Sequence, residues 1–215
     1  MTPIAAATVG RPLARLHAMT DGATLARDDF AARAAAIAAA GSPVALHARD
    51  RALGGSALAG LAARLVALAR PAEASVVVSG RADVAMAVGA QGVQLSAADL
   101  TPADARRVLP HGWIGRSVHS LDEAAAALGE GAHYLIAGSI YATASHPGRA
   151  PIGVGALREI VGLGLPVIAV GGVDAARAGE VHEAGAWGVA AISALWGAPD
   201  PAGAALALLE PWTTA

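Results

Sequence analysis

Two pairs of small residues near the end of the chain are suited to holding a phosphate group. Gly171 and Gly172 follow one short apolar run, and Ile192 and Ser193 close another. A glycine lets the backbone approach a ligand without a β-carbon in the way, and successive backbone N–H groups can form a concave anion site. If the two runs are neighbouring strands, both pairs face the same anion. The alternative is that the glycines only permit a tight turn.

Histidines are the best candidates for acid–base chemistry, because imidazole titrates near neutral pH. His119, in the stretch GRSVHS, is the strongest of them, and His47 and His146 come next. A histidine that precedes a helix can instead cap it or bond to a loop. Asp99 is a candidate for Mg²⁺, but hard cations usually need more than one carboxylate or phosphate oxygen. A solvated aspartate before a helix is the competing interpretation.

Short β-rich runs alternate with alanine-rich helical patterns along the chain, which predicts repeated βα units and a parallel sheet. We count eight units and expect a single-domain α/β fold, a (β/α)8 TIM barrel over residues 1–215. A doubly wound sheet is the alternative, but no glycine fingerprint follows the first strand. The expected strands are 15–19, 44–47, 75–78, 92–95, 113–118, 134–137, 167–170 and 188–192. The expected helices are 28–40, 56–69, 81–88, 102–109, 121–128, 155–161, 175–184 and 201–209.

In such a barrel the reactive groups lie at the carboxyl ends of the strands, often with a phosphate site after strands seven and eight. The two small-residue pairs occupy that place. The other polar residues expected at this end are Asp21, His47, Arg49, Ser79, Arg81, Gln94, Ser96, Asp99, Ser117, His119, Ser139, Tyr141, Thr143, Ser145 and His146.

Composition narrows the chemistry further. The chain has no cysteine, lysine or asparagine, which excludes thiolate chemistry, a lysine Schiff base and a Walker-type phosphate loop. A net charge of −2 without a basic cluster argues against nucleic acid as a partner. No run is long and apolar enough to span a membrane, and no secretion signal is visible, so we expect a cytoplasmic protein. The expected ligand is small, and self-association into a homo-oligomer is compatible with the sequence.

The stretches IGRSVHSLDEA, YLIAGSIYATASHPG, PVIAVGGV and GVAAISAL resemble the thiamine phosphate synthase and TenI (thiazole tautomerase) superfamily. The resemblance covers nearly the whole chain and is most specific over residues 114–195. It implies a (β/α)8 barrel that binds a thiazole phosphate, with its phosphate at Gly171, Gly172, Ile192 and Ser193.

Departures from the synthase pattern favour the TenI branch. Synthases of this superfamily carry Q-x-R-x-K after strand two, where this chain has Ala45, His47 and Arg49. Asn-Asp after strand three is replaced by Ser79-Gly80. The T-x-T-K segment is replaced by residues 143–146, again without its lysine. Releasing a diphosphate needs closely placed cations, and most of them are missing at these positions.

We therefore expect a tautomerase that aromatises a carboxythiazole phosphate without a cofactor, with His119 as general acid and base. Arg49, Ser79, Ser117, Thr143 and Ser145 are the expected substrate-binding residues. The first alternative is a thiamine phosphate synthase, which joins hydroxymethylpyrimidine diphosphate to thiazole phosphate and uses Mg²⁺ at Asp99. The second is a non-catalytic barrel that binds a phosphorylated metabolite and acts in regulation.

Overall fold

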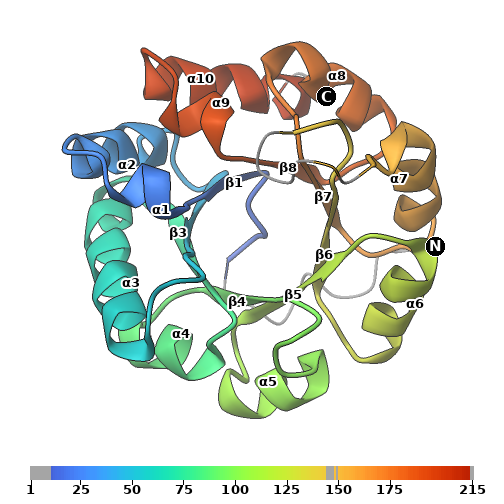
Figure 1. Ribbon diagram of the computed structural model, residues 1–215, viewed down its shortest axis with the longest axis horizontal. Helices are drawn as coiled ribbons and strands as arrows, with labels where there is room; N and C mark the ends of the chain where they lie inside the picture. Colours follow the sequence, from blue (N-terminus) through green and yellow to red (C-terminus); the bar gives the residue numbers. More distant parts are fainter. Residues whose placement is uncertain (1–10, 144–147, 149, 214–215) are drawn as a thin grey trace.

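Eight parallel strands form a closed barrel in the computed structural model of the protein, which describes residues 11–143, 148 and 150–213. The strands pair in chain order, and β8 closes the ring against β1 (Figure 1). Their bounds are β1 (Leu16–Met19), β2 (Val44–Ala48), β3 (Ser75–Ser79), β4 (Gly92–Leu95), β5 (Trp113–Val118), β6 (Tyr134–Gly138), β7 (Val167–Val170) and β8 (Gly188–Ala191).

Helices surround this ring and cover the outer face of the strands (Figure 1). The α-helices are α1 (Gly22–Leu25), α2 (Phe30–Ala38), α3 (Gly55–Ala69), α4 (Ala82–Val88), α5 (Pro102–Val108), α6 (Leu121–Gly129), α7 (Gly153–Val161), α8 (Ala175–Glu183), α9 (Ser193–Trp196) and α10 (Pro201–Leu209). Two short 3₁₀ helices, η1 (Arg70–Ala72) and η2 (Glu210–Trp212), follow α3 and α10.

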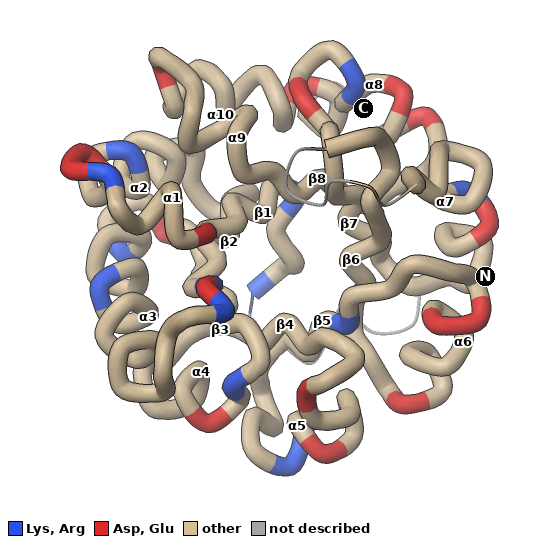
Figure 2. The backbone as a smooth tube through the Cα atoms, viewed as in Figure 1, with Lys and Arg blue, Asp and Glu red and all other residues tan. Residues whose placement is uncertain are grey.

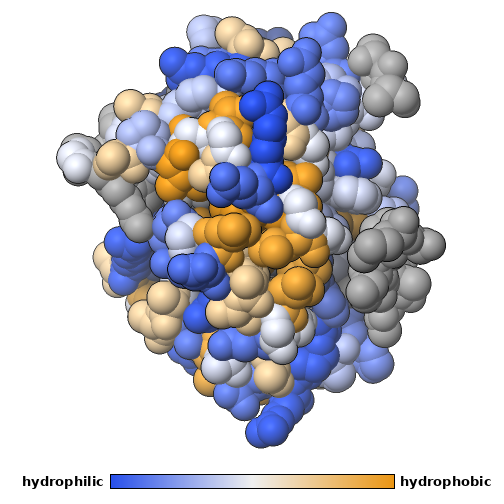
Figure 3. Space-filling model, turned by 90° about the vertical axis from the view of Figure 1, so that its right-hand side faces the viewer, coloured by the Kyte–Doolittle hydropathy of each residue, from blue (hydrophilic) through white to orange (hydrophobic). Residues whose placement is uncertain are grey.

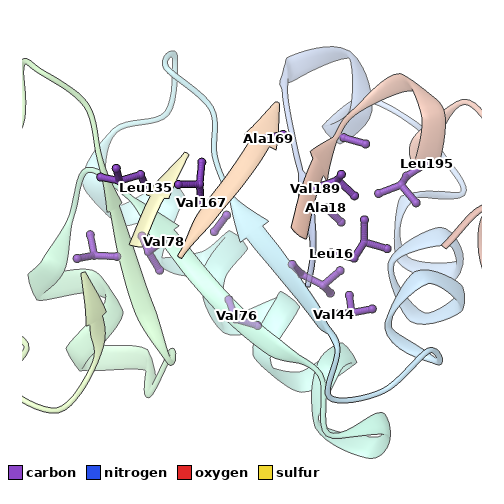
Figure 4. Close-up of a cluster of buried hydrophobic side chains, with 14 of the residues drawn as sticks. Leu16, Ala18, Val44, Val76, Val78, Leu135, Val167, Ala169, Val189 and Leu195 are labelled. Atoms are coloured by element: carbon purple, nitrogen blue, oxygen red, sulfur yellow. The ribbon is translucent and has the colours of Figure 1, made fainter. Parts of the chain in front are cut away.

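The main hydrophobic core lies between the outer face of the barrel and the helices. Leu16, Val44, Val76 and Val189 point outward from their strands and are almost completely buried, and Leu195 of α9 joins them (Figure 4). Parallel strands covered on both faces have little contact with water, so they consist of nearly continuous apolar residues. Because the strands are parallel, their carboxyl ends lie together at one mouth of the barrel.

The inward face of the barrel holds a second, mixed cluster. Ala45, Val77, Ile136 and Ile168 are apolar members of this cluster, and Tyr134 lies among them. The segment before β1 closes the barrel at the amino-terminal ends of the strands. There Arg15 stacks over the Trp187 ring at 3.5 Å and donates to the carbonyl oxygen of Trp187 at 2.7 Å.

The predicted fold class is confirmed, and all eight predicted strands are present with ends that differ by at most one residue. The short helices α1 and α9 were not predicted. The helix expected at 28–40 begins only at Phe30. Asp29 before it accepts hydrogen bonds from the side chains of Arg27 and Arg33, and these bonds hold the chain in a turn.

Charged residues lie mainly in the surrounding helices and loops (Figure 2). The side of the molecule that carries α6 and α7 also exposes apolar surface, framed by hydrophilic residues (Figure 3). Leu121 and Leu128 on α6 contribute to the exposed apolar surface. Within the described part of the chain, no helix combines the length and apolar character that a bilayer span requires.

Candidate active site

A pocket of about 1120 Å³ opens at the carboxyl ends of the strands, where the barrel was expected to carry its site. It brings together residues from the ends of all eight strands, which are distant in the sequence. The sequence-predicted site residues that line this pocket are Arg49, Ser79, Asp99, Ser117, His119, Thr143, Gly171, Gly172, Ile192 and Ser193.

The two small-residue pairs lie at the ends of β7 and β8, which are hydrogen-bonded neighbours in the barrel. Gly171 and Gly172 have φ angles of 96° and 66°, a conformation that favours glycine. The N–H groups of Gly172, Ser193 and Ala194 donate no hydrogen bond to any described residue. Backbone amides with this property, converging from two strand ends, suit an anion.

Both glycines also have a packing reason. A β-carbon on Gly171 would lie 2.5 Å from Cβ of Ser139, and one on Gly172 would lie 2.6 Å from the carbonyl oxygen of Ala142. The loop after β6 therefore packs directly against the end of β7. Tight packing and anion binding are compatible, because the glycines that accept the loop leave their amides at the pocket.

Arg177 adds a cation beside this amide corner and was not among the predicted site residues. It lines the pocket from the first turn of α8 and donates to the carbonyl oxygen of Gly172 at 2.6 Å. Its guanidinium lies 4.7 Å from the centre of the Tyr141 ring, and Tyr141 in turn donates to Glu180 at 2.6 Å. These contacts hold a positive charge next to Gly172.

His119 follows β5 and reaches the pocket with a defined ring orientation. Its Nδ1 bonds to the carbonyl oxygen of Gly138, and its backbone N–H donates to Glu123 at 2.7 Å. A carbonyl only accepts hydrogen bonds, so Nδ1 carries a proton and Nε2 of the neutral ring is an acceptor. The next residue caps α6: Ser120 accepts from the N–H of Glu123, while the Glu123 carboxylate accepts from the backbone N–H of His119.

Arg49 provides a half-buried cation at the opposite part of the pocket, after β2. Its backbone N–H donates to the Thr20 hydroxyl at 3.0 Å, and its guanidinium reaches the Thr20 carbonyl at 3.2 Å. Burial lowers the pKa of Arg49, and the nearby charge of Arg51 lowers it further. The charges of Asp21 and Asp50 act in the opposite direction, and an anion bound here would favour the positive charge of Arg49 in the same way.

Arg51 and Arg81 bring further positive charge to the same side, and Arg51 was not counted in the sequence analysis. Both line the pocket together with Gly55, near the start of α3. Arg81 forms two hydrogen bonds with Asp83, which raise the pKa of Arg81, and its third nitrogen faces Gly55. A β-carbon on Gly55 would lie 2.8 Å from that nitrogen.

Asp99 is the predicted carboxylate for a hard cation. Its Oδ2 accepts hydrogen bonds from the backbone and side chain of Ser96, both at 2.7 Å. Its Oδ1 faces Gly80, where a β-carbon would lie 2.8 Å away. The described residues contain no cluster of three or more metal-ligating side chains. Asp99 therefore suits a cation only if a ligand supplies most of the oxygen atoms, as substrate phosphates do for Mg²⁺.

Other candidates lie elsewhere. His47 is completely buried inside the barrel, where its Nε2 bonds to His17 at 2.8 Å, and it does not line the pocket. The side chain of Asp21 caps α1 by accepting from Thr24. Ser145 and His146 lie outside the described residues.

Ser117 and Thr143 reach the pocket, and the Ser117 hydroxyl accepts from Gln94 at 3.0 Å.

Comparisons with known proteins agree with this geometry. The profile of the thiamine monophosphate synthase family matches residues 16–195. A protein of Methanoculleus marisnigri called thiamine-phosphate synthase is 40% identical over 198 residues, which cover 91% of this chain and 93% of that protein. The thiamine-phosphate synthase of Thermus thermophilus is 41% identical over 152 residues, 70% of this chain and 73% of its own.

Solved structures show the same relationship. The thiamine phosphate pyrophosphorylase of Pyrococcus furiosus superposes with a TM-score of 0.79 at 33% identity, covering 93% of this chain and 96% of that one. A 3-hexulose-6-phosphate synthase superposes with a TM-score of 0.67 at 20% identity, a likeness of fold alone.

These relatives correct the expectation of a TenI-type tautomerase, which is wrong. The relatives that match over most of the chain are named synthases, and the first alternative fits them. The error has a physical cause. Cations were counted only at the motif positions after β2 and β6, whereas Arg51 and Arg81 reach the same pocket from other positions.

Proposed function

The chain belongs to the thiamine monophosphate synthase family, and from this premise we propose that it joins hydroxymethylpyrimidine diphosphate to thiazole phosphate with release of diphosphate. The observation that carries the proposal is that one pocket has groups suited to an anion at two of its ends. Backbone amides that donate to no described residue form one end together with Arg177, and Arg49, Arg51 and Arg81 form the other. A carboxythiazole phosphate would bring only one carboxylate to the second end, whereas a diphosphate brings several negative charges to its three arginines.

We place the thiazole phosphate at the β7–β8 end. Gly171, Gly172, Ile192 and Ser193 offer backbone groups to a monophosphate, and Arg177 adds a charge beside them. The β2–β3 end then receives the diphosphate. These two ends lie on different sides of the barrel ring (Figure 1), so the reacting parts of both substrates meet between them.

In this reaction the bond between the methylene carbon of the pyrimidine and the diphosphate oxygen breaks, and the electron pair leaves with diphosphate. A new bond joins the same carbon to the thiazole. Negative charge develops on the leaving oxygen, so fixed cations next to it stabilise the transition state. Arg49 supports this role best, because it is half-buried and its backbone and guanidinium both bond to Thr20.

Mg²⁺ fits the proposed reaction through Asp99. The Asp99 carboxylate is held by Ser96 and faces the glycine after β3, so it would hold the ion together with diphosphate oxygens. When bound, the ion neutralises charge on the diphosphate. Asp99 itself serves as an oriented ligand.

The remaining pocket residues are proposed to bind and orient the substrates. His119 presents Nε2 as a hydrogen-bond acceptor, since its Nδ1 proton is used by Gly138. Ser117, Ser79 and Thr143 add polar groups around the centre of the pocket. The proton-transfer role first expected for His119 belonged to the tautomerase and is not carried over to the synthase.

Incubation of the purified protein with hydroxymethylpyrimidine diphosphate, thiazole phosphate and Mg²⁺ tests the proposal. We expect thiamine phosphate and diphosphate to form in equal amounts, and neither when one substrate is omitted. The Arg107→Gln variant, changed at an exposed arginine on α5 outside the pocket, is the matched control and should retain the rate. Binding of both substrates without product would contradict the proposal and favour a non-catalytic role.

A further inference from the structure

Four buried polar atoms inside the barrel have no hydrogen-bond partner among the described residues. They are Nδ1 of His47, Oγ of Ser79, Oε1 of Gln94 and the hydroxyl of Tyr134. They come from β2, β3, β4 and β6, at positions that alternate with the outward-facing apolar residues. A buried polar group without a partner costs free energy, so four such groups in one barrel point to a ligand that satisfies them.

The strand register brings three of these groups onto one row of the sheet. Ser79 is opposite Gln94, Gln94 is opposite Gly115, and Gly115 is opposite Tyr134. Gly115 has no side chain, and the side chains of Gln94 and Tyr134 occupy the space above it. A β-carbon on Gly115 would contact Oε1 of Gln94 and would lie 2.6 Å from the Tyr134 hydroxyl. Both unpartnered atoms therefore converge over Gly115.

His47 lies next to this row of polar residues, one step closer to the amino-terminal end of the barrel. The His17 ring lies between the two regions, with its centre 5.0 Å from that of His47 and 5.5 Å from that of Tyr134. Nε2 of His17 is 3.2 Å from the carbonyl oxygen of Ala14, so it carries the proton. Nδ1 of His17 then accepts from Nε2–H of His47 at 2.8 Å. This order leaves Nδ1 of His47 as an acceptor.

The hydrogen-bonding roles define the chemistry of the ligand. His47 Nδ1 and Gln94 Oε1 are acceptors, and the hydroxyls of Ser79 and Tyr134 can each donate or accept. None of the four carries a formal charge: burial lowers the pKa of both His17 and His47, so the two rings are neutral. Water has two protons to donate and two lone pairs to accept, and it suits a set of two to four such partners.

We propose that the barrel interior contains a buried water-binding site, centred over Gly115 between Gln94 and Tyr134 and continued toward Ser79 and His47. This site lies beneath the pocket and supports its floor. The Gln94 amide nitrogen donates to the hydroxyl of Ser117 at 3.0 Å, and both residues line the pocket. Ordered water on Oε1 therefore fixes the amide that orients Ser117. This site is inferred without reference to the reaction proposed above, although Ser79 and Gln94 also line the pocket.

A crystal structure of the whole chain at atomic resolution, alone and as Tyr134→Phe, tests this proposal. We expect a water peak within about 2.7–3.2 Å of Gln94 Oε1 and the Tyr134 hydroxyl. The Tyr134→Phe variant should lose or displace that peak. Tyr141→Phe is the matched control: Tyr141 is the chain's other tyrosine, its hydroxyl bonds to Glu180, and the interior peak should remain.

Three results would overturn the proposal. One is a direct Tyr134–Gln94 hydrogen bond with no peak above Gly115. Another is a peak surrounded by several oxygens at the short distances of a metal ion. The third is a peak that Tyr134→Phe leaves unchanged. If Tyr134→Phe fails to fold, two experiments take its place. One is a crystal structure of Ser79→Ala, and the other is magnetic relaxation dispersion of water nuclei with the unmodified protein. A long-lived internal water is then expected in solution, and its absence contradicts the site.

Discussion

The position of the arginines decides how this site is interpreted at the scale of single residues. Arg49 lies at one end of the pocket and Arg177 at the other, and the two sit after strands on different sides of the ring. A family motif records residue types at fixed positions. An anion site depends on where the charges lie in the folded protein, whatever their positions in a motif. Arg51 and Arg81 lie outside the motif positions, so they were not counted from the sequence as replacements for the missing lysines.

Replacing Arg49 tests the diphosphate end. We expect Arg49→Gln to raise the KM for hydroxymethylpyrimidine diphosphate by about 10- to 100-fold, the value of one hydrogen bond to a charged group. The KM for thiazole phosphate should change little. Steady-state kinetics with each substrate varied in turn measures both, and Arg107→Gln serves as the control. Equal effects on both substrates would show that Arg49 acts on the whole pocket instead of on one end.

Replacing Arg177 tests the monophosphate end with the opposite selectivity. Arg177 is exposed, so its charge is screened by solvent, and Arg177→Gln should raise the KM for thiazole phosphate by only roughly 2- to 5-fold. The KM for the diphosphate substrate should remain unchanged in the same assay. A larger effect on the diphosphate substrate would reverse our assignment of the two ends.

Much of the pocket followed from the sequence at this scale, because parallel strands must end at one mouth. His119, Ser117 and Gly172 were placed there correctly from strand ends alone. His47 was not, although it is only two residues from Arg49. Both side chains face the barrel interior, but His47 lies one step deeper and is covered. Sequence alternation gives the direction of a side chain and does not give its depth.

At the scale of elements, the strands were predictable because their apolar runs are bounded by glycine and by helical patterns. The helices α1 and α9 were missed because each has four residues, too few for a periodic pattern to appear. Their existence depends on local bonds, such as the Asp21 side chain on the N–H of Thr24. The short α9 matters for the site, since its first residue is Ser193.

The N-terminal cap of α6 gives a prediction at this scale. The Ser120 hydroxyl accepts from the N–H of Glu123 at 3.2 Å, directly after His119. Ser120→Ala should lower the free energy of unfolding by about 1 kcal/mol. Urea denaturation followed by circular dichroism measures this loss, and Leu121→Ala, at an exposed residue of the same turn, is the control. An unchanged midpoint for Ser120→Ala would show that the Glu123–His119 bond alone holds this end of the helix.

For the whole molecule, the buried His17–His47 pair couples stability to pH. Burial lowers the pKa of His17 from 6.5 to about 4 and lowers that of His47, which also feels the charges of His17 and Arg49. The unfolded chain binds protons first, so stability is full above about pH 6.5 and is lost as pH falls toward 4. For His17 alone the loss is on the order of 3 kcal/mol.

Urea unfolding between pH 7 and pH 4.5 tests this dependence. The free energy of unfolding should fall steadily with pH, while the paired carboxylates Asp29 and Asp83, with pKa values of about 2, contribute only at lower pH. His133, whose pKa is also lowered to about 4, contributes in the same direction. The exposed His111→Gln variant should keep the slope. A stability independent of pH in this range would show that burial does not lower the pKa of the two rings in the folded protein.

The interior polar row could not be predicted from the sequence. Gln94 and Tyr134 are 40 positions apart, and their atoms converge only because the closed barrel places Gly115 between them. The register of a barrel is a property of the whole ring, set by every strand pair together. Sequence patterns report on single strands, so they predicted the ring and not its interior contacts.

Simultaneous binding tests the central claim, a single pocket with two anion-binding ends, most directly. Protein saturated with thiazole phosphate is titrated with diphosphate and Mg²⁺ in a calorimeter. We expect one equivalent of diphosphate per chain to bind with an affinity that thiazole phosphate does not weaken, and Arg49→Gln to reduce it. Competition between the two ligands, with either one displacing the other, would contradict the claim.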